Sequence, residues 1–331
     1  MFIAEVSANH LGSLARAREI VYQVAKSGAT AIKFQTYTAD TMTLNIDAFK
    51  ISKKHNLWGG KKLYDLYEEA HTPWKWHPEL FDLARSLDLI PFSSPFDLSA
   101  VKFLEKLQTP MYKIASMETG DLELIRSIAE TGKPIIMSTG ASNLEEIDDA
   151  VETVFNTGNN NLTLLLCTSS YPAVPRDSHL MRIEFLRERY KLEVGLSDHT
   201  LGIGVSIAAI ALGAVAIEKH FTLRRADGGA DGAFSMEPEE FKQLVEEGKR
   251  AHESLGNYDW QIQNSEAESR NLRRSLYITK NVSKGELITP DNLRAIRPGQ
   301  GLAPKYYRQL LGKKFSGDFE IGTPMKEEYA Q

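Results

Sequence analysis

Short apolar runs and amphipathic stretches alternate along the first 257 residues of the chain. Eight runs of four or five mostly apolar residues have the length and composition of buried strands. They are Phe2–Val6, Ala31–Phe34, Ile90–Ser93, Met111–Ile114, Pro134–Met137, Leu162–Leu166, Glu193–Leu196 and Ala216–Lys219. Between and after these runs apolar residues recur every three or four positions, which predicts helices. The predicted helices are Ala15–Ser27, Pro78–Leu87, Leu98–Leu107, Leu122–Thr131, Leu144–Asn156, Met181–Tyr190, Gly204–Leu212 and Pro238–Leu255.

Local signals support the ends of these helices. Ser142 and Asn143 are capping residues in front of one helix, and Pro238 with the two glutamates after it is typical of a helix start. Glycines stand just past three of the helices, where a left-handed backbone favours them: Gly28, Gly132 and Gly213.

Eight strand–helix pairs in about 257 residues predict an α/β fold, a (β/α)8 TIM barrel over residues 1–257. The alternative is a doubly wound sheet, which uses the same alternation with fewer strands. No GxGxxG motif follows the first run, which weakens that alternative. Residues 36–77 separate the second strand from its helix, and we expect so long an insertion to cover the catalytic face of the barrel.

The pattern changes after Gly256. Residues 258–273 are polar and are predicted to form a linker. Residues 274–331 carry turn signals every 6 to 12 residues, which predicts a small α+β domain. A domain of this size has little core, so we expect it to pack against something larger.

Charge and cysteine content narrow the class of protein. The 331 residues include 39 Lys and Arg against 44 Asp and Glu, a net charge of −5, which argues against a nucleic-acid partner. The lone Cys167 cannot form an internal disulfide, so a reducing compartment is expected. The first ten residues do not resemble a signal peptide, and the longest apolar stretch, near residues 207–217, is too short to cross a membrane. These features predict a cytoplasmic protein.

The carboxyl ends of barrel strands surround the active site, and all eight predicted strands end in polar residues. These residues are Glu5, Asn9, His10, Lys33, Gln35, Ser93, Ser94, Lys113, Ser116, Glu118, Ser138, Thr139, Thr168, Ser169, Ser170, Tyr171, Ser197, Asp198, His199, Glu218, Lys219 and His220. So many polar strand ends predict a functional site.

His199 and His220 end adjacent strands at equivalent depth, so their imidazoles could converge on a divalent metal. The alternative is that each merely forms hydrogen bonds at the rim. Five further histidines are expected to be solvated, and the role of His10 stays open. The five are His55, His71, His77, His179 and His252.

Lys33 and Lys113 end otherwise apolar strands, and a buried ammonium needs a negative partner. With the nearby serine hydroxyls they could hold a phosphate and a carboxylate. Alternatively, one lysine could form a Schiff base, or both could form structural salt bridges with Glu5, Glu118 or Glu218. Cys167 is expected to belong to the core.

A set of ordered motifs resembles the sialic-acid-synthase family of nonulosonate synthases. The motifs are IAEVSANHLG, AIKFQTY, PFSSPFD, YKIASMETGD, IMSTGAS, LLCTSSYP, GLSDHTLG and AIEKHFTL, and NVSKGELITPDNLRAIRPGQGL resembles the family's SAF (antifreeze-protein-like) domain. The resemblance covers the whole chain. It implies an enzyme, a transferase that condenses phosphoenolpyruvate with an acetamido sugar aldehyde.

The same resemblance implies roles for individual residues. His199 and His220 would bind a divalent metal, Mn or Mg, and Arg297 would enter the partner's barrel in a domain-swapped homodimer. The implied catalytic residues are Glu5, Lys113 and Glu218. The implied substrate-binding residues are Lys33, Gln35, Ser94 (a Thr position in the family), Phe96, Ser116, Glu118, Ser138, Tyr171, Ser197, Asp231 and Arg297.

Within the family, the segments WGGKKLYDLYEEAHTPWKWH and GGADGAFSMEP most resemble the pseudaminic acid synthase branch. Sialic acid synthases usually have a His where this chain has Gly232, and they lack the aromatic block of residues 58–76. These departures imply a 2,4-diacetamido-2,4,6-trideoxy hexose as substrate rather than N-acetylmannosamine. An N-acetylneuraminate or legionaminic acid synthase is the alternative, followed by a Schiff-base aldolase and a non-catalytic sugar-binding protein.

Overall fold

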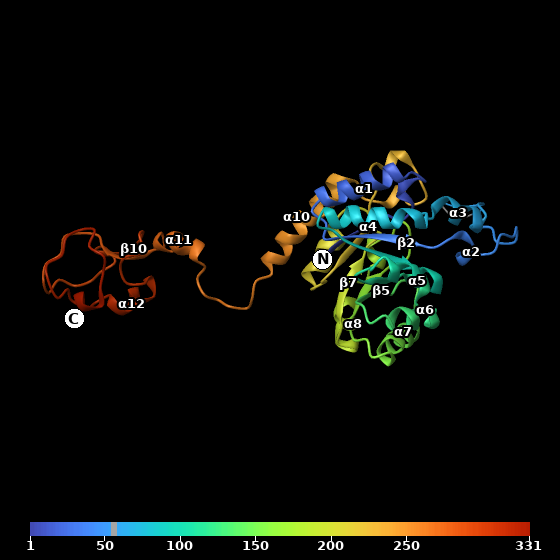
Figure 1. Ribbon diagram of the computed structural model, residues 1–331. Helices are drawn as coiled ribbons and strands as arrows, with labels where there is room; N and C mark the ends of the chain where they lie inside the picture. The colour runs from blue at the N-terminus through green and yellow to red at the C-terminus, as the bar shows by residue number, and fades with distance from the viewer. Residues whose placement is uncertain (54–57) are drawn as a thin grey trace. The chain divides into compact units, whose positions relative to one another are not determined.

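The computed structural model describes residues 1–53 and 58–331. The chain divides into two compact units, Met1–Gly256 and Asn257–Gln331 (Figure 1). Among the described residues, no helix combines the length and the apolar character needed to span a bilayer.

The first unit is a closed barrel of eight parallel strands in chain order. The strands are β1 (Phe2–Glu5), β2 (Ala31–Thr36), β3 (Ile90–Pro95), β4 (Tyr112–Ile114), β5 (Ile135–Ser138), β6 (Leu162–Cys167), β7 (Glu193–Ser197) and β8 (Ile217–His220). The barrel closes where β8 pairs with β1, with Phe2 opposite Ile217 and Glu5 opposite His220. The predicted (β/α)8 barrel is confirmed, and closure of the sheet excludes the doubly wound alternative.

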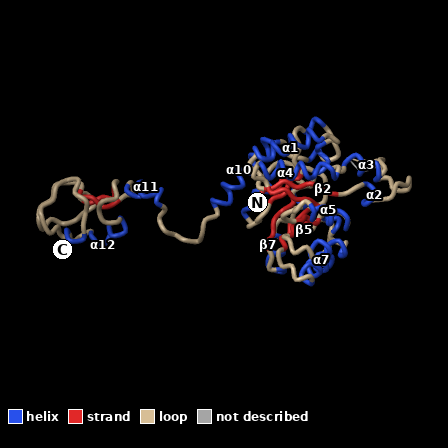
Figure 2. The backbone as a smooth tube through the Cα atoms, in the orientation of Figure 1, coloured by secondary structure: helices blue, strands red, loops and turns tan. Residues whose placement is uncertain are grey.

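Helices surround the strands on the outside of the barrel (Figure 2). They are α1 (Leu14–Lys26), α4 (His77–Ser86), α5 (Leu98–Lys106), α6 (Leu122–Ala129), α7 (Leu144–Asn156), α8 (Arg182–Tyr190), α9 (Gly204–Ala211) and α10 (Pro238–Ser254). The ends of these helices lie within two residues of the predicted ends.

The capping signals act where the sequence placed them. Of the two candidate caps before α7, Asn143 is the one used: its Oδ1 accepts a hydrogen bond from Glu146 N at 3.0 Å, and its N–H donates to Glu146 Oε2 at 2.7 Å. Gly28, Gly132 and Gly213 have φ values of 76°, 70° and 86°, the left-handed conformation that ends a helix.

The two-residue period of the strands separates a structural layer from a functional layer inside the barrel. Ile3, Ile136 and Ala216 fill the lower interior. Two residues further along the same strands, the inward positions are polar: Glu5, Ser138 and Glu218. The apolar layer therefore supports a polar layer at the carboxyl ends of the strands.

The insertion between β2 and α4 folds into α2 (Ala39–Met42), α3 (Leu63–Ala70) and the 3-10 turn Trp74–Trp76. Residues 54–57, including His55, lie outside the described residues. Aromatic rings pack the base of the insertion: Trp74 stacks on Phe103 with centroids 4.8 Å apart, and the Tyr37 and Tyr67 rings are 5.8 Å apart. We call the described residues from Tyr37 to Trp76 the lid.

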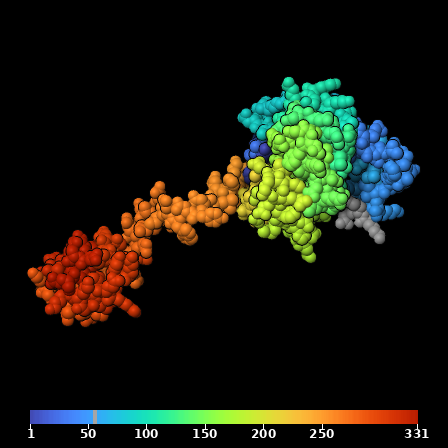
Figure 3. All heavy atoms as spheres, turned by 90° about the horizontal axis from the view of Figure 1, so that it is seen from below, coloured from blue at the N-terminus to red at the C-terminus, as the bar shows by residue number. Residues whose placement is uncertain are grey.

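The second unit has its own small core and appears as a compact body in the space-filling view (Figure 3). It contains α11 (Ala267–Asn271), the antiparallel pair β9 (Ser275–Ile278) and β10 (Leu293–Ile296), and α12 (Tyr307–Leu310). Its buried apolar residues are Leu276, Ile278, Val282, Ile288, Leu293, Leu310, Phe315 and Met325. The predicted small α+β domain is confirmed.

Candidate active site

A cavity of about 490 Å³ lies at the carboxyl ends of the barrel strands, and the lid forms part of its wall. Thirteen of the residues that the sequence implicated line it: Lys33, Gln35, Phe96, Lys113, Ser116, Glu118, Ser138, Tyr171, Ser197, His199, Glu218, His220 and Asp231. Glu5 and Ser94 are buried next to lining residues on β2, with exposed fractions of 1% and 0%. Arg297 belongs to the second unit.

Two lysines and two glutamates form a buried charged cluster at the base of this cavity. Lys33 Nζ lies 2.6 Å from Glu5 Oε2 and 3.1 Å from Glu218 Oε1. Lys113 Nζ lies 3.8 Å from Glu218 Oε1 and donates to Ser138 Oγ at 2.7 Å. These groups come from β1, β2, β4, β5 and β8, so only closure of the barrel brings them together. The salt bridges that the sequence left open as an alternative are therefore present.

The cluster leaves the two lysines in different electrostatic states. Burial alone would lower the pKa of Lys33, but the carboxylates of Glu218 and Glu5 outweigh burial and raise it. Lys113 has no equally close carboxylate, and burial lowers the pKa of its ammonium to about 8. Burial raises the pKa of Glu5, whereas Lys113 and Lys33 overcome the same burial effect at Glu218 and lower its pKa. Lys113 is thus the cation that an anionic ligand would stabilise most.

Serine hydroxyls surround these charges. Ser197 Oγ donates to Glu218 Oε1 at 3.2 Å, and Ser116 Oγ accepts from Gly140 N at 3.1 Å. A Cβ atom on Gly140 would lie 2.3 Å from Ser169 Oγ and 2.8 Å from Ser116 Oγ, so only glycine leaves these hydroxyls in place. Ser94 Oγ is buried without a hydrogen-bond partner among the described residues. Such a donor is suited to a ligand oxygen.

Carboxyl groups and aromatic rings form the upper wall. Glu118 Oε2 has no hydrogen-bond partner within residues 1–53 and 58–331, and burial raises the pKa of Glu118 to about 7. Asp231 accepts a short hydrogen bond from Ser7 Oγ. Trp58 Nε1 donates to Ala230 O at 2.9 Å and its ring lies 6.1 Å from that of Tyr171, which ties the lid to two barrel loops. This wall can bind hydroxyl and amide groups while presenting apolar surface.

His199 and His220 converge as the sequence predicted, with ring centroids 5.4 Å apart. His199 Nδ1 lies 3.0 Å from Thr168 O, which leaves Nε2 available. His220 Nδ1 is buried without a hydrogen-bond partner among described residues, and it is 3.9 Å from Asp231 Oδ2. Burial, followed by the neighbouring positive groups, lowers the pKa of His220 well below its usual value, so its ring is neutral.

One imidazole nitrogen from each of His199 and His220 fits a divalent cation whose other positions are taken by water or substrate. In the described part of the chain, no group of three or more His, Cys, Asp or Glu side chains is arranged to hold a metal ion. The candidate metal ligands are therefore the two histidines alone.

Residues 20–259 match the model of the NeuB family, and residues 273–328 match that of the SAF domain. The chain belongs to the NeuB family. It is 42% identical over 325 residues to the pseudaminic acid synthase of Campylobacter jejuni subsp. jejuni serotype O:23/36, covering 98% of this chain and 95% of the relative. It is 43% identical over 327 residues to the pseudaminic acid synthase of Helicobacter pylori, covering 98% and 96%.

A solved NeuB-type structure agrees with the fold. The N-acetylneuraminic acid (sialic acid) synthetase of Leptospira borgpetersenii is 32% identical, with a TM-score of 0.72, and the match covers 81% of this chain and 89% of the other. The family resemblance drawn from the ordered motifs is confirmed.

Several residues of this NeuB site carried no decisive signal in the sequence. Ser7 donates its backbone N–H to Glu5 Oε1 at 2.8 Å and its hydroxyl to Asp231, yet a serine after a strand is common. Tyr37, Met42 and Leu66 line the cavity from the lid, where the apolar pattern predicts only packing. The single clue was the insertion itself.

Two expectations about individual residues need correction. His77 was expected to be solvated, but it is fully buried at the start of α4, where Nε2 lies 2.9 Å from Thr36 Oγ1. Cys167 is buried as expected, yet it also lines the cavity, with Sγ 3.9 Å from His199 Nδ1. Both differences arise from contacts with residues distant in the chain, Thr36 beside His77 and His199 beside Cys167. His10 is also buried, and burial lowers its pKa to about 4.

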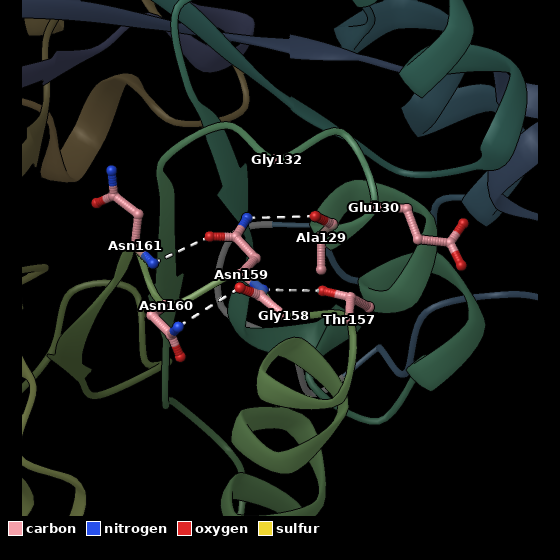
Figure 4. A pocket seen from close by; sticks show the side chains of 8 residues that line it. All are labelled: Ala129, Glu130, Gly132, Thr157, Gly158, Asn159, Asn160 and Asn161. Carbon is pink, nitrogen blue, oxygen red and sulfur yellow. Dashed lines mark hydrogen bonds between the residues drawn. The ribbon is translucent and has the colours of Figure 1, made fainter.

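A second hollow lies at the opposite, amino-terminal end of the barrel, between the turns that precede β5 and β6 (Figure 4). Asn159 fills it by donating to Ala129 O at 3.2 Å and to Lys133 O at 2.9 Å, and it accepts from Asn161 N at 2.9 Å. These bonds satisfy the backbone of two turns, so Asn159 has a structural role.

Proposed function

We propose that this NeuB protein is a pseudaminic acid synthase. It condenses phosphoenolpyruvate with 2,4-diacetamido-2,4,6-trideoxy-L-altrose and water, and it releases pseudaminic acid and phosphate. The observation that carries the proposal is the convergence of two lysines, two glutamates, several serine hydroxyls and two histidines around one cavity. The names of the relatives at 42% and 43% identity support the choice of sugar.

Phosphoenolpyruvate binds at the base of the cavity in this proposal. Lys113 and Lys33 offset the negative charge of its phosphate and carboxylate, and the hydroxyls of Ser94, Ser116, Ser138 and Ser197 donate to their oxygens. Two observations support this placement: Ser94 Oγ has no hydrogen-bond partner among the residues that the structure describes, and burial lowers the pKa of Lys113. A bound anion would accept a hydrogen bond from Ser94 and stabilise the ammonium of Lys113.

The sugar occupies the upper cavity. Its acetamido and hydroxyl groups are within the reach of Gln35, Glu118, Tyr171 and Asp231. The apolar part of the wall, which includes Phe96 and the lid residues Met42, Ile51, Leu63 and Leu66, suits the methyl group of a 6-deoxy sugar better than a hydroxymethyl group.

In the proposed reaction one carbon–carbon bond forms and the C2–O bond to the phosphate breaks. C3 of phosphoenolpyruvate forms a bond with the aldehyde carbon of the open-chain sugar while water adds to C2. Glu5, whose pKa is raised by burial, exchanges protons near these atoms, and Glu218 keeps Lys33 in position for the carboxylate. The C2–O bond to the phosphate then breaks. A divalent metal held by His199 and His220 would polarise the aldehyde oxygen.

Arg297 completes the proposed enzyme as part of a domain-swapped homodimer. Arg297 is exposed at the end of β10, and the turn that follows it is fixed without its side chain: Ser275 Oγ donates to Pro298 O at 2.7 Å and accepts from Gly301 N at 2.8 Å. The guanidinium is thus available to bind the sugar in the barrel of a second subunit.

A panel of sugars tests the proposal. Purified protein with Mn²⁺ and phosphoenolpyruvate is given the L-altrose derivative, its D-manno isomer or N-acetylmannosamine, and phosphate release and product mass are measured. We expect the largest kcat/KM with the L-altrose derivative and loss of turnover in EDTA that added Mn²⁺ restores. A higher kcat/KM with N-acetylmannosamine or with the D-manno isomer would instead assign the chain to the sialic or legionaminic acid branch.

A Schiff-base aldolase is the second candidate, since burial lowers the pKa of Lys113 to about 8, as in lysine nucleophiles. Borohydride added during turnover would trap substrate on the lysine of such an aldolase, and EDTA would leave its activity intact. We expect no covalent adduct.

A further inference from the structure

Behind the two histidines, on the outer side of β7 and β8, lies a buried ion pair that the proposed reaction does not use. Lys219 Nζ donates to Asp198 Oδ2 at 2.9 Å, and each side chain is 1% exposed. Asp198 directly precedes His199, and Lys219 directly precedes His220. Because side chains alternate along a strand, the pair and the histidines project to opposite faces.

Every acceptor position of the Asp198 carboxylate is used within the fold. Asp198 Oδ1 accepts from Thr200 N at 2.8 Å and from Thr200 Oγ1 at 2.7 Å. Asp198 Oδ2 also accepts from Ser206 Oγ of α9 at 2.6 Å, and Lys219 donates to Thr200 O at 2.6 Å. With four donors around its carboxylate, Asp198 has no lone pair directed at the cavity, so it is not itself a metal ligand.

The pair lies where the backbone ladder between the two strands ends. Paired residues of β7 and β8 are Leu196 with Ile217 and Ser197 with Glu218, followed by one bond from Asp198 N to Glu218 O at 2.9 Å. The backbone carbonyls of the two histidines bond to other segments of the chain. His199 O accepts from Ala173 N at 3.0 Å, and His220 O accepts from Met236 N at 2.8 Å. Beyond the backbone bond between Asp198 and Glu218, the side-chain pair links the two chain segments beside the histidines.

We propose that Asp198 and Lys219 are positioning residues that fix the separation of His199 and His220 for metal binding. A buried ion pair stabilises a fold only weakly compared with apolar side chains of the same shape, so the geometry that this pair imposes is its more important effect. Groups behind metal ligands commonly change metal affinity by 10- to 100-fold. This inference rests on the proposed metal site of the enzyme.

The test is the dissociation constant for Mn²⁺ of the full chain, measured from the electron paramagnetic resonance signal of free Mn²⁺, together with the melting temperature of the metal-free protein. Asp198→Asn is expected to weaken Mn²⁺ binding about tenfold and to lower the melting temperature, because it leaves Lys219 buried without a counter-charge. The double variant Asp198→Asn/Lys219→Met removes both charges. Its melting temperature should recover, while its Mn²⁺ affinity stays about tenfold weaker.

Two controls separate this inference from the metal site itself. The first control is Asp148→Asn. Asp148 also accepts several hydrogen bonds, from Arg189 and Tyr190, but it joins α7 to α8 on the outside of the barrel. The Mn²⁺ affinity of this variant should equal that of the wild type. His199→Ala should abolish binding, and wild-type affinity in that variant would refute the metal site. If His199→Ala loses Mn²⁺ but the double variant binds it as the wild type does, the positioning role is wrong and the pair only stabilises the fold.

Discussion

Lys113 is one of the residues of the site whose charge changes with pH close to the neutral range. Burial lowers its pKa to about 8, so the ammonium loses its proton above that pH in the free enzyme. A neutral Lys113 no longer offsets the charge of phosphoenolpyruvate. The KM for phosphoenolpyruvate should therefore rise above pH 8, by up to roughly tenfold for each pH unit, while bound substrate, which favours the ammonium, keeps kcat less affected.

Initial rates between pH 6.5 and 9.5 measure this effect. Lys113→Arg is the matched control, because an arginine stays charged throughout this range. The rise in KM should disappear in that variant, and an unchanged rise would assign the titration to another group.

Glu118 also has a shifted pKa, with a consequence for stability. Burial raises its pKa to about 7 in the folded protein from an ordinary value of 4.5. A raised carboxyl pKa means that the folded state binds the proton more tightly, so the folded protein loses stability as pH rises from 4.5 through 7. Deprotonation of the buried Glu118 carboxyl costs on the order of 3 kcal/mol of folding stability above pH 7, and Glu118→Gln removes this cost.

Urea unfolding of the first unit at pH 5 and pH 8 compares the two proteins. The gain in unfolding free energy from Glu118→Gln should be larger at pH 8 than at pH 5, and turnover should fall because the proposed contact of Glu118 with the sugar is lost. An equal gain at both pH values would show that the glutamine acts through packing rather than charge.

At the scale of elements, the lid is held over the cavity by Trp58. Its indole N–H donates to Ala230 O, and its ring contacts that of Tyr171. Trp58→Phe removes the hydrogen bond, a loss of about 1 kcal/mol. The KM for the sugar should rise about fivefold, which corresponds to that energy, and the KM for phosphoenolpyruvate, which binds deeper, should not change.

Trp74→Phe is the matched control for the lid. Trp74 Nε1 also donates to a backbone carbonyl, Tyr37 O at 3.1 Å, but Trp74 does not line the cavity. Its replacement should lower thermal stability without changing the KM for the sugar. Equal changes in KM for both variants would mean that the lid acts through its overall stability.

For the whole molecule, the proposed domain-swapped homodimer would place Arg297 of one subunit in the barrel of the other. Arg297→Ala should raise the KM for the sugar or lower kcat, because the proposed contact of its guanidinium with the sugar is lost, while phosphoenolpyruvate affinity and the mass of the proposed dimer stay nearly unchanged. A hybrid dimer of one Arg297→Ala subunit and one His199→Ala subunit should recover about one functional site. In that hybrid, the Arg297→Ala subunit keeps His199 in its barrel, and the His199→Ala subunit supplies Arg297 to it.

Tagged subunits allow the hybrid to be isolated and its composition verified before the assay. Both parent homodimers serve as controls and should have little activity. A verified hybrid with no more activity than its parents would show that Arg297 acts within its own subunit or has no role in the reaction.

The order and type of the barrel elements follow from local patterns in the sequence. Each strand and helix is specified locally by a two-residue or four-residue period and by caps such as Asn143 before α7, so its position can be recognised without its neighbours. The same local pattern also predicted most of the candidate site. Strand order and direction in a (β/α)8 barrel fix which strand ends meet, so polar residues at the carboxyl ends of the strands are expected to lie together.

The pairing and the charge states of those residues depend instead on contacts made in the folded protein. Lys33 is bonded to Glu5 and Glu218, which lie 28 residues before it and 185 residues after it, and the opposite pKa shifts of Lys33 and Lys113 depend on which carboxylates come within reach. Burial of His77 and the closure of Trp58 on Ala230 likewise depend on contacts between distant segments. Desolvation and Coulomb energies depend on distances in space, and a sequence pattern contains those distances only for neighbours along the chain.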